Sequence, residues 1–68
     1  MNIAKVVQIV ASSNKSFEDA VNEGLTAAAR TIRGITGVKV IDWTAKVENN
    51  RISQYRVTMD IAFHVEEG

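Results

Sequence analysis

The alternation of hydrophobic and polar residues divides the chain into three kinds of segment. Residues 3–11 are rich in β-branched side chains and apolar on both alternating phases, which predicts a strand with contacts on both faces. Such a strand would be covered on one side by a helix of its own chain and on the other by a neighbouring subunit. The turn-prone residues Ser12-Ser13-Asn14 end it.

A single apolar stripe at helical spacing follows and predicts a helix over about residues 16–33. Ser16 can cap its first turn, and Gly34 suits the left-handed conformation that ends many helices. Most stripe residues are small, so we expect the helix to lie close against a sheet. The stripe consists of Phe17, Ala20, Val21, Gly24, Leu25, Ala28, Ala29 and Ile32.

Two further strands are predicted in the second half of the chain. In residues 38–47 the apolar phase changes between Val40 and Ile41, which requires a bulge, a twist or burial of both faces. Residues 48–51 predict a hairpin turn, because both central residues are Asn, which tolerates positive φ. Residues 55–66 alternate most regularly, so one face of this strand should meet the helix while the other is polar.

The element order predicts an α+β fold in which a three-stranded antiparallel sheet packs on one helix. The helix returns the chain so that the first strand runs in the same direction as the second. The first strand can therefore join an antiparallel sheet only beside the third, which gives the order 2-3-1. Two open edges and one uncovered face remain, and these invite pairing with another chain.

Composition strengthens the expectation of an oligomer. The 68 residues form a single domain, 46% of them are hydrophobic, and there is no Cys to provide a disulfide or a thiolate metal site. A chain of this mass exposes about 4,200 Å² when folded and about 10,900 Å² when unfolded, so it buries only about 60% of its surface. Self-association is one way to stabilise a domain this small.

Charge and hydropathy narrow the classes of partner and location. Eight basic and eight acidic residues give zero net charge, which removes the general electrostatic argument for binding nucleic acid or an anionic membrane. No apolar run approaches the roughly 20 residues of a spanning helix, and the N-terminus lacks the pattern of a signal peptide. We expect a soluble, cytoplasmic protein.

Few residues suggest catalytic chemistry, and no enzyme is expected. The single histidine, His64, lies on the predicted polar face. Asp42 and Asp60 would form a carboxylate pair able to bind a metal ion if the register placed them opposite one another, although solvated acids or salt bridges are favoured. Trp43 could stack on a planar ligand or pack in a core or subunit interface, and packing is favoured.

Three segments, together with the chain length and the element order, resemble the dodecins. They are KVVQIVASS at residues 5–13, SFEDAV at residues 16–21 and the strand from Tyr55-Arg56-Val57 to Phe63-His64-Val65-Glu66-Glu67. The resemblance implies one dodecin-like domain over residues 1–68 that assembles into a hollow homododecamer. It also implies a flavoprotein that holds riboflavin, FMN or FAD in pairs between subunits, for storage or sequestration without turnover.

The chain departs from this family at its ligand contacts. The flavin-binding members carry a Trp that stacks on the ring where this chain has Gly37, and a Gln that binds the ring edge where it has Arg56. His64 falls where some relatives carry a basic residue at the flavin site. Trp43 lies six residues beyond Gly37, about 20 Å along an extended strand, and shares its parity only if no bulge intervenes.

These departures leave two hypotheses open. In the first, a flavin site contains Gly37, Arg56, His64 and Trp43. In the second, a dodecin-like shell has lost flavin binding and serves as a scaffold, or binds a metal ion or another small anion. Arg56 could then attract a phosphate or a carboxylate.

Overall fold

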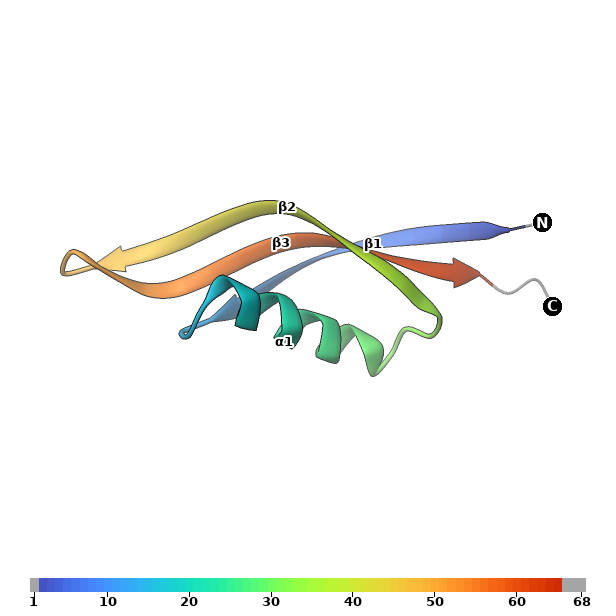
Figure 1. Cartoon of the computed structure of the whole chain (residues 1–68), viewed down its shortest axis with the longest axis horizontal. Coiled ribbons are helices and arrows are strands. Elements are labelled where there is room, and N and C mark those ends of the chain that lie inside the picture. Colours follow the sequence, from blue (N-terminus) through green and yellow to red (C-terminus); the bar gives the residue numbers. More distant parts are fainter. Residues whose placement is uncertain (1, 66–68) are drawn as a thin grey trace.

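The computed structural model describes residues 2–65, which form one antiparallel sheet with a helix against one face (Figure 1). The elements are β1 (Ile3–Ser13), α1 (Phe17–Ala29), β2 (Ile35–Glu48) and β3 (Arg51–Val65). The strands lie in the order β1-β3-β2. The predicted topology and the central third strand are therefore confirmed. Glu66, which the sequence assigns to the third strand, lies outside the described residues.

The pairing of β1 with β3 sorts the side chains between the two faces of the sheet. It runs without a break from Ile3 opposite Val65 to Ser13 opposite Tyr55. Within residues 55–65 of β3 the odd-numbered residues face α1, and three of them are the largest fully buried side chains: Val57, Met59 and Ile61. The even-numbered residues from Gln54 to His64 and their partners lie on the opposite side, called the open face below. A register shift between Lys46 and Val47 reverses this parity nearer the hairpin tip, so that Ile52 lies on the helix side.

The pairing of β2 with β3 is interrupted by bulges. One register shift lies between Val40 and Asp42, so Ile41 has no partner on β3. This bulge confirms the interruption expected from the change in hydrophobic phase. It also shifts the alternation of β2 by one residue, so that side chains on either side of it exchange faces.

The link between β1 and α1 is held by side-chain hydrogen bonds. Ser16 is the extended N-cap of α1, and its hydroxyl accepts from the Asp19 backbone N–H at 2.9 Å. The Ser13 hydroxyl donates to the Asp19 carboxylate at 2.5 Å and accepts from the Lys15 N–H at 2.9 Å. Both the predicted cap and the helix start are thereby confirmed.

The helix ends four residues earlier than expected. The N–H of Thr31 bonds to the carbonyl of Ala28 at 3.1 Å, and that of Arg30 to Ala27 at 3.2 Å, so the last turn tightens from the α-helical pattern. Gly34 has the expected left-handed φ of 74°, but it is not the helix stop, because α1 ends at Ala29 with Arg30 as its right-handed C-cap. The Gly34 carbonyl instead accepts from the His64 N–H at 2.9 Å, at the start of β2.

Both strands of the hairpin begin earlier than predicted, because pairing overrides the local sequence pattern. β2 starts at Ile35 rather than Val38 and includes Gly37, since Ile35 and Gly37 pair with Phe63 and Ala62. β3 starts at Arg51 rather than at residue 55, directly after the turn. The turn itself is confirmed: Asn49 and Asn50 have φ of 53° and 63°.

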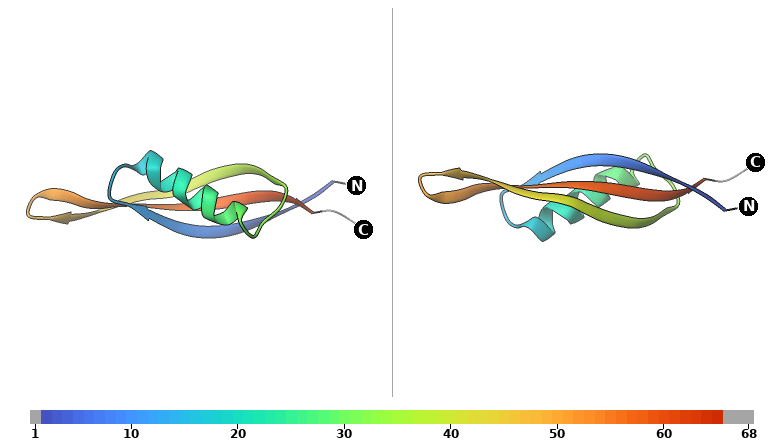
Figure 2. Two further views of the ribbon diagram at one scale, coloured as in Figure 1. Left: turned by 90° about the horizontal axis from the view of Figure 1, so that it is seen from below. Right: turned by 90° about the horizontal axis from the view of Figure 1, so that it is seen from above.

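The β2–β3 hairpin extends well beyond the helix as an arm (residues 45–55; Figures 1 and 2). The described chain measures 53 × 19 × 12 Å and exposes 5144 Å². This is about 900 Å² more than the folded area expected for its mass. The chain is thus much more extended than a typical domain of its size.

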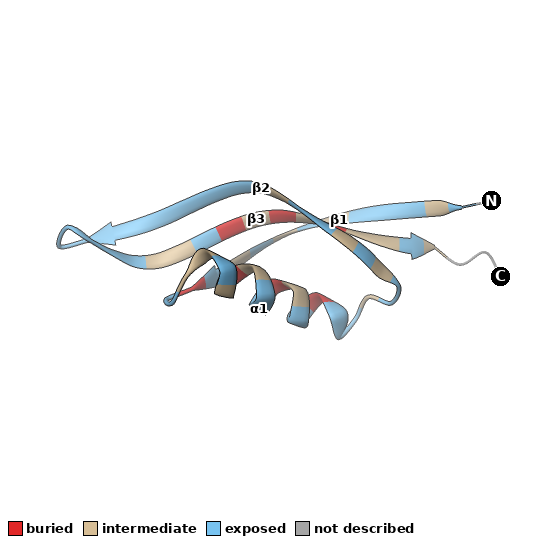
Figure 3. Ribbon diagram, viewed as in Figure 1, coloured by how far each residue is buried: buried red, intermediate tan, exposed pale blue. Residues whose placement is uncertain are grey.

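The hydrophobic core is small and lies only where α1 crosses the sheet (Figure 3). Its buried apolar side chains are Ala20, Ala28, Val57, Met59 and Ile61. Gly24 brings the helix close to the sheet, because a Cβ there would lie 2.9 Å from the Ala11 Cβ and 2.1 Å from the Met59 Cε. The small helical stripe therefore packs as the sequence predicts.

We expect Gly24→Ala to lower the free energy of unfolding. The Met59 side chain can move away, but the Ala11 Cβ is fixed to β1, and overpacking of this kind costs about 1–3 kcal/mol. The gain in helix propensity of about 1 kcal/mol offsets part of that cost. Urea unfolding followed by circular dichroism, at equal protein concentration, should show a net loss of about 0–2 kcal/mol.

Gly37→Ala is the matched control, because a Cβ there meets nothing within 4 Å. Its unfolding free energy should change by no more than about 0.5 kcal/mol. A Gly24→Ala variant more stable than the unmodified chain would contradict the close helix–sheet contact.

Candidate ligand-binding face

Three of the four residues predicted for the site lie on the open face of the sheet. Gly37 lies opposite Ala62, and His64, two positions along β3, lies opposite Ala4. Gly37 and His64 are therefore diagonal neighbours on that face. Arg56 is on the same face, between Ser12 and Thr44.

Within one chain, however, Gly37 and Arg56 are far apart. Ala62, which pairs with Gly37, lies six positions from Arg56 along β3, which corresponds to about 20 Å. A single planar ring cannot contact both positions of one chain. If both contact one ligand, the second position must come from another copy.

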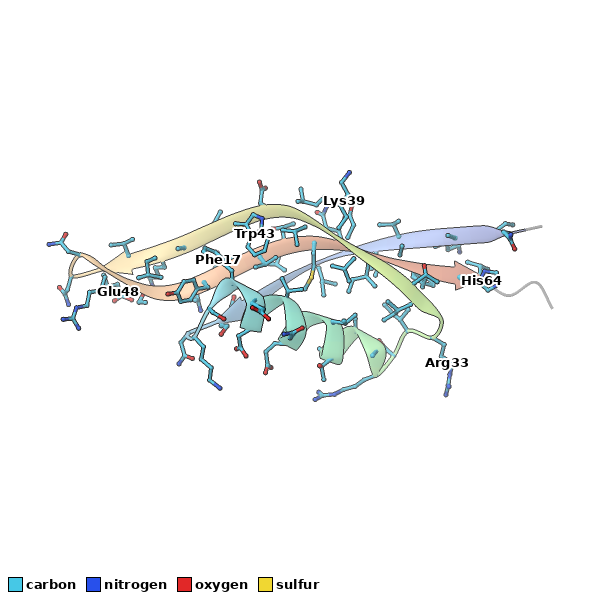
Figure 4. The ribbon with its side chains drawn as sticks, viewed as in Figure 1. Phe17, Arg33, Lys39, Trp43, Glu48 and His64 are labelled. Atoms are coloured by element: carbon cyan, nitrogen blue, oxygen red, sulfur yellow. The ribbon has the colours of Figure 1, made fainter. Side chains whose placement is uncertain are left out.

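Trp43 lies on the opposite side of the sheet. It pairs with Val57, whose side chain is buried beneath α1, because the bulge at Ile41 has shifted the alternation. Its ring meets Phe17 edge-on, with centroids 5.3 Å apart and planes at 86°, and Phe17 meets Tyr55 in the same way at 4.9 Å. Figure 4 shows Trp43 directed toward Phe17, whereas Lys39 points away from the helix.

The structure thus does not bring Trp43 to the face that carries Gly37. Trp43 could take the place of the family's stacking Trp directly only if no bulge lay between Gly37 and Trp43. The bulge at Ile41 means that this condition is not met. Trp43 nevertheless remains 53% exposed. Its assignment to a ligand site stays a prediction, and in one chain its ring could contact only a group that approaches from the helix side.

Arg56 lies in a shallow basic cavity of about 340 Å³ on the open face of the arm. Its guanidinium donates to the Gln54 side-chain oxygen at 3.2 Å. Lys46 also lines this cavity, and the only ion pair among residues 2–65 joins it to the exposed Glu48 at 3.8 Å. Two neighbouring cations in a cavity can accept a phosphate or a carboxylate.

The sequence did not reveal that Lys46 and Gln54 accompany Arg56. Counting back from a two-residue turn would place Lys46 opposite Ser53. A second bulge shifts the register so that Lys46 pairs with Gln54 and Thr44 with Arg56. No feature of the sequence signals this bulge.

The two acids considered as a metal-binding pair are not opposite one another, so that hypothesis is not supported. Asp60 lies opposite Lys39 and accepts a hydrogen bond from Gln8 at 3.0 Å, whereas Asp42 lies opposite Thr58. In the part of the chain that the structure describes, no three His, Cys, Asp or Glu side chains are grouped closely enough to hold a metal ion. No helix there is long and apolar enough to cross a membrane.

Solved structures with the same fold cover nearly all of the chain. The dodecin from Streptomyces davaonensis is 23% identical, with a TM-score of 0.91 and 97% of each chain covered. A point variant of the Thermus thermophilus dodecin is 24% identical, with a TM-score of 0.95 and both chains fully covered. A calcium-chelating dodecin from Mycobacterium tuberculosis is 26% identical, with a TM-score of 0.80, covering 94% of this chain and 91% of that one.

The sequence also matches a protein-family model. The dodecin model matches residues 3–66, whereas the search of curated proteins found no match. Family and fold together support a small-molecule-binding protein. The chain belongs to the dodecin family.

Proposed function

We propose that this protein assembles as a hollow homododecamer that holds flavins between its subunits, for storage or sequestration without turnover. The observation that carries the proposal is the position of Gly37 and Arg56 on one face but about 20 Å apart. In the flavin-binding members of the family, the residues at these two positions contact a single flavin ring. In this chain they can contact the same ring only if they come from different subunits. The cytoplasmic location expected from the sequence stays a prediction.

The surface of the single chain supports self-assembly. Val6 and Val10 are 60% and 59% exposed on the open face of β1. In the three-stranded sheet, β1 and β2 are both edges, whose outer backbone groups are free to pair with another chain. The excess of about 900 Å² over the expected folded area is close to the area that one partner contributes to a stable interface.

The altered contacts predict weaker flavin binding than in the family members with Trp and Gln. Stacking on a large aromatic ring contributes about 0.5–1.5 kcal/mol beyond area burial, and one hydrogen bond contributes about 1 kcal/mol. Losing both weakens binding by about one to two orders of magnitude. His64 and Arg56 remain as polar groups that can bind a ring edge or a phosphate.

A second candidate is a shell that binds a small anion without flavin. The cavity lined by Lys46 and Arg56 favours this candidate, because both cations lie on the open face. One structural relative is described as calcium-chelating, so Ca²⁺ belongs among the ligands to be tested.

Flavin binding should be measurable by fluorescence quenching. We expect purified protein to quench added riboflavin or FMN at micromolar concentration, and to show bound flavin in its visible spectrum if it is purified with ligand. Colourless protein without quenching in that range would exclude the flavin function. Calorimetry with inorganic phosphate and with Ca²⁺ then distinguishes an anion from a metal ion as ligand.

The assembly is tested separately by size-exclusion chromatography with light scattering. A dodecamer is expected whether or not flavin is added. A monomer would contradict the proposed shell and, with it, a ligand site between subunits.

Gly37→Trp should strengthen flavin binding. A Cβ at Gly37 meets nothing within 4 Å, so the open face has room for the start of a larger side chain. The added ring stacking predicts an affinity about three- to tenfold higher. The increase is measured by flavin fluorescence titration.

Val38→Trp is the matched control, because Val38 is the next residue but pairs with Ile61 on the helix side. It adds the same indole ring and should leave the flavin affinity unchanged. An equal increase in both variants would argue against Gly37 as a ligand contact.

A further inference from the structure

The hairpin arm has an apolar side that its own chain does not cover. Val47 and Ile52 pair with one another near the tip and are 62% and 49% exposed, and Trp43 at the base of the arm is 53% exposed on the same side of β2. The helix begins at Phe17, at the base of the arm, so none of residues 2–65 outside the arm packs beneath its tip (Figures 1 and 2). This apolar strip consists of Trp43, Val47 and Ile52.

A groove of complementary character lies between α1 and β1. Its volume is about 530 Å³, and the small residues of the helix that make it hollow are Gly24, Ala27 and Ala28. Val7, Ile9 and Ile32 supply larger apolar side chains to its walls. Glu23 is the only charged residue that lines it.

The arm and the groove of one chain cannot meet. Both arm strands are continuous with the sheet, and β3 runs as a single strand from Arg51 to Val65. The groove lies on the β1 side of β3, whereas β2 pairs with its other side. If an arm occupies the groove, that arm must therefore belong to a second copy of the chain.

One further feature favours this occupant. The exposed area in excess of about 900 Å² is of the size that one partner buries in a stable protein interface.

We propose that the arm of one copy lies in the α1–β1 groove of the next copy, with Val47 and Ile52 inserted between β1 and the small residues of α1. Each copy offers one arm and one groove, so the contact is heterologous and produces a ring when it closes. This inference rests on the proposed self-assembly and names the surfaces that produce it.

The absence of cysteine allows a direct test by cross-linking. Ile52→Cys places a thiol on the arm and Ala27→Cys places one in the groove, and both replace residues with exposed surface. The two variants are co-expressed, oxidised and separated on a non-reducing gel. We expect a covalent dimer containing one chain of each kind, because a disulfide requires Cα atoms within about 7 Å.

Single variants and a matched pair complete the design. Each variant oxidised alone should stay monomeric on the gel. Lys46→Cys is on the same arm but on the open face, so its combination with Ala27→Cys should not cross-link. Dimers from Ile52→Cys alone would indicate an arm–arm contact and overturn the proposal, as would equal cross-linking by Lys46→Cys. If Ile52→Cys does not fold, Val47→Cys replaces it.

Trp43 provides a second measurement, because it is the only tryptophan in the chain. In the assembly its emission should shift to shorter wavelength than in a dissociated chain, and Ile52→Asp should reverse this shift while retaining the far-UV circular dichroism of a folded protein. An assembled protein with neither the cross-link nor the shift would refute the arm–groove contact while leaving the proposed dodecamer intact. A monomer would refute both.

Discussion

The length of the helix relative to the sheet determines most of what this protein exposes. With 13 residues, α1 is about 20 Å long, whereas the described chain extends 53 Å. One short helix can cover only the middle of the sheet, and the buried apolar core is confined to that region. The arm and the whole open face are left uncovered, although both carry apolar side chains. The large exposed surface is therefore a direct consequence of the lengths of the elements. Its apolar part can be covered only by neighbouring copies or another partner.

A single bulge then decides which side chains those neighbours meet. Without the extra residue at Ile41, Trp43 would share a face with Gly37 and stand near the polar residues of the sheet. With it, Trp43 packs edge-on against Phe17 on the helix side, while Gly37, Arg56 and His64 share the open face. The strand thus separates an apolar strip suited to contact between copies from a polar face suited to a ligand.

The topology could be predicted from the sequence because each element carries a strong local signal. The helical stripe, the Asn49-Asn50 turn and the alternation of β3 depend on residues close together in the chain, and all three agree with the structure. Features that depend on register could not be predicted. The opposition of Asp60 to Lys39 and of Lys46 to Gln54 is set by bulges, and the second bulge leaves no mark on the hydrophobic pattern. The exposed state of Ile52 likewise depends on how far α1 reaches.

The separation of the two faces also means that residues of the open face, where the ligand site is proposed, can change while the fold stays the same. The packing that holds the chain together lies between α1 and the sheet and involves Ala20, Met59 and their neighbours, and none of these lies on the open face. Gly37 and Arg56 lie on that face and make no contribution to the buried core. Under the proposed function, replacing an aromatic ring and an amide there would remove ligand contacts worth about one hydrogen bond and one stacked ring without opening a cavity in the core. The open face could therefore change its ligand while the core and the arm are preserved, and conservation of the fold would not require conservation of a bound molecule.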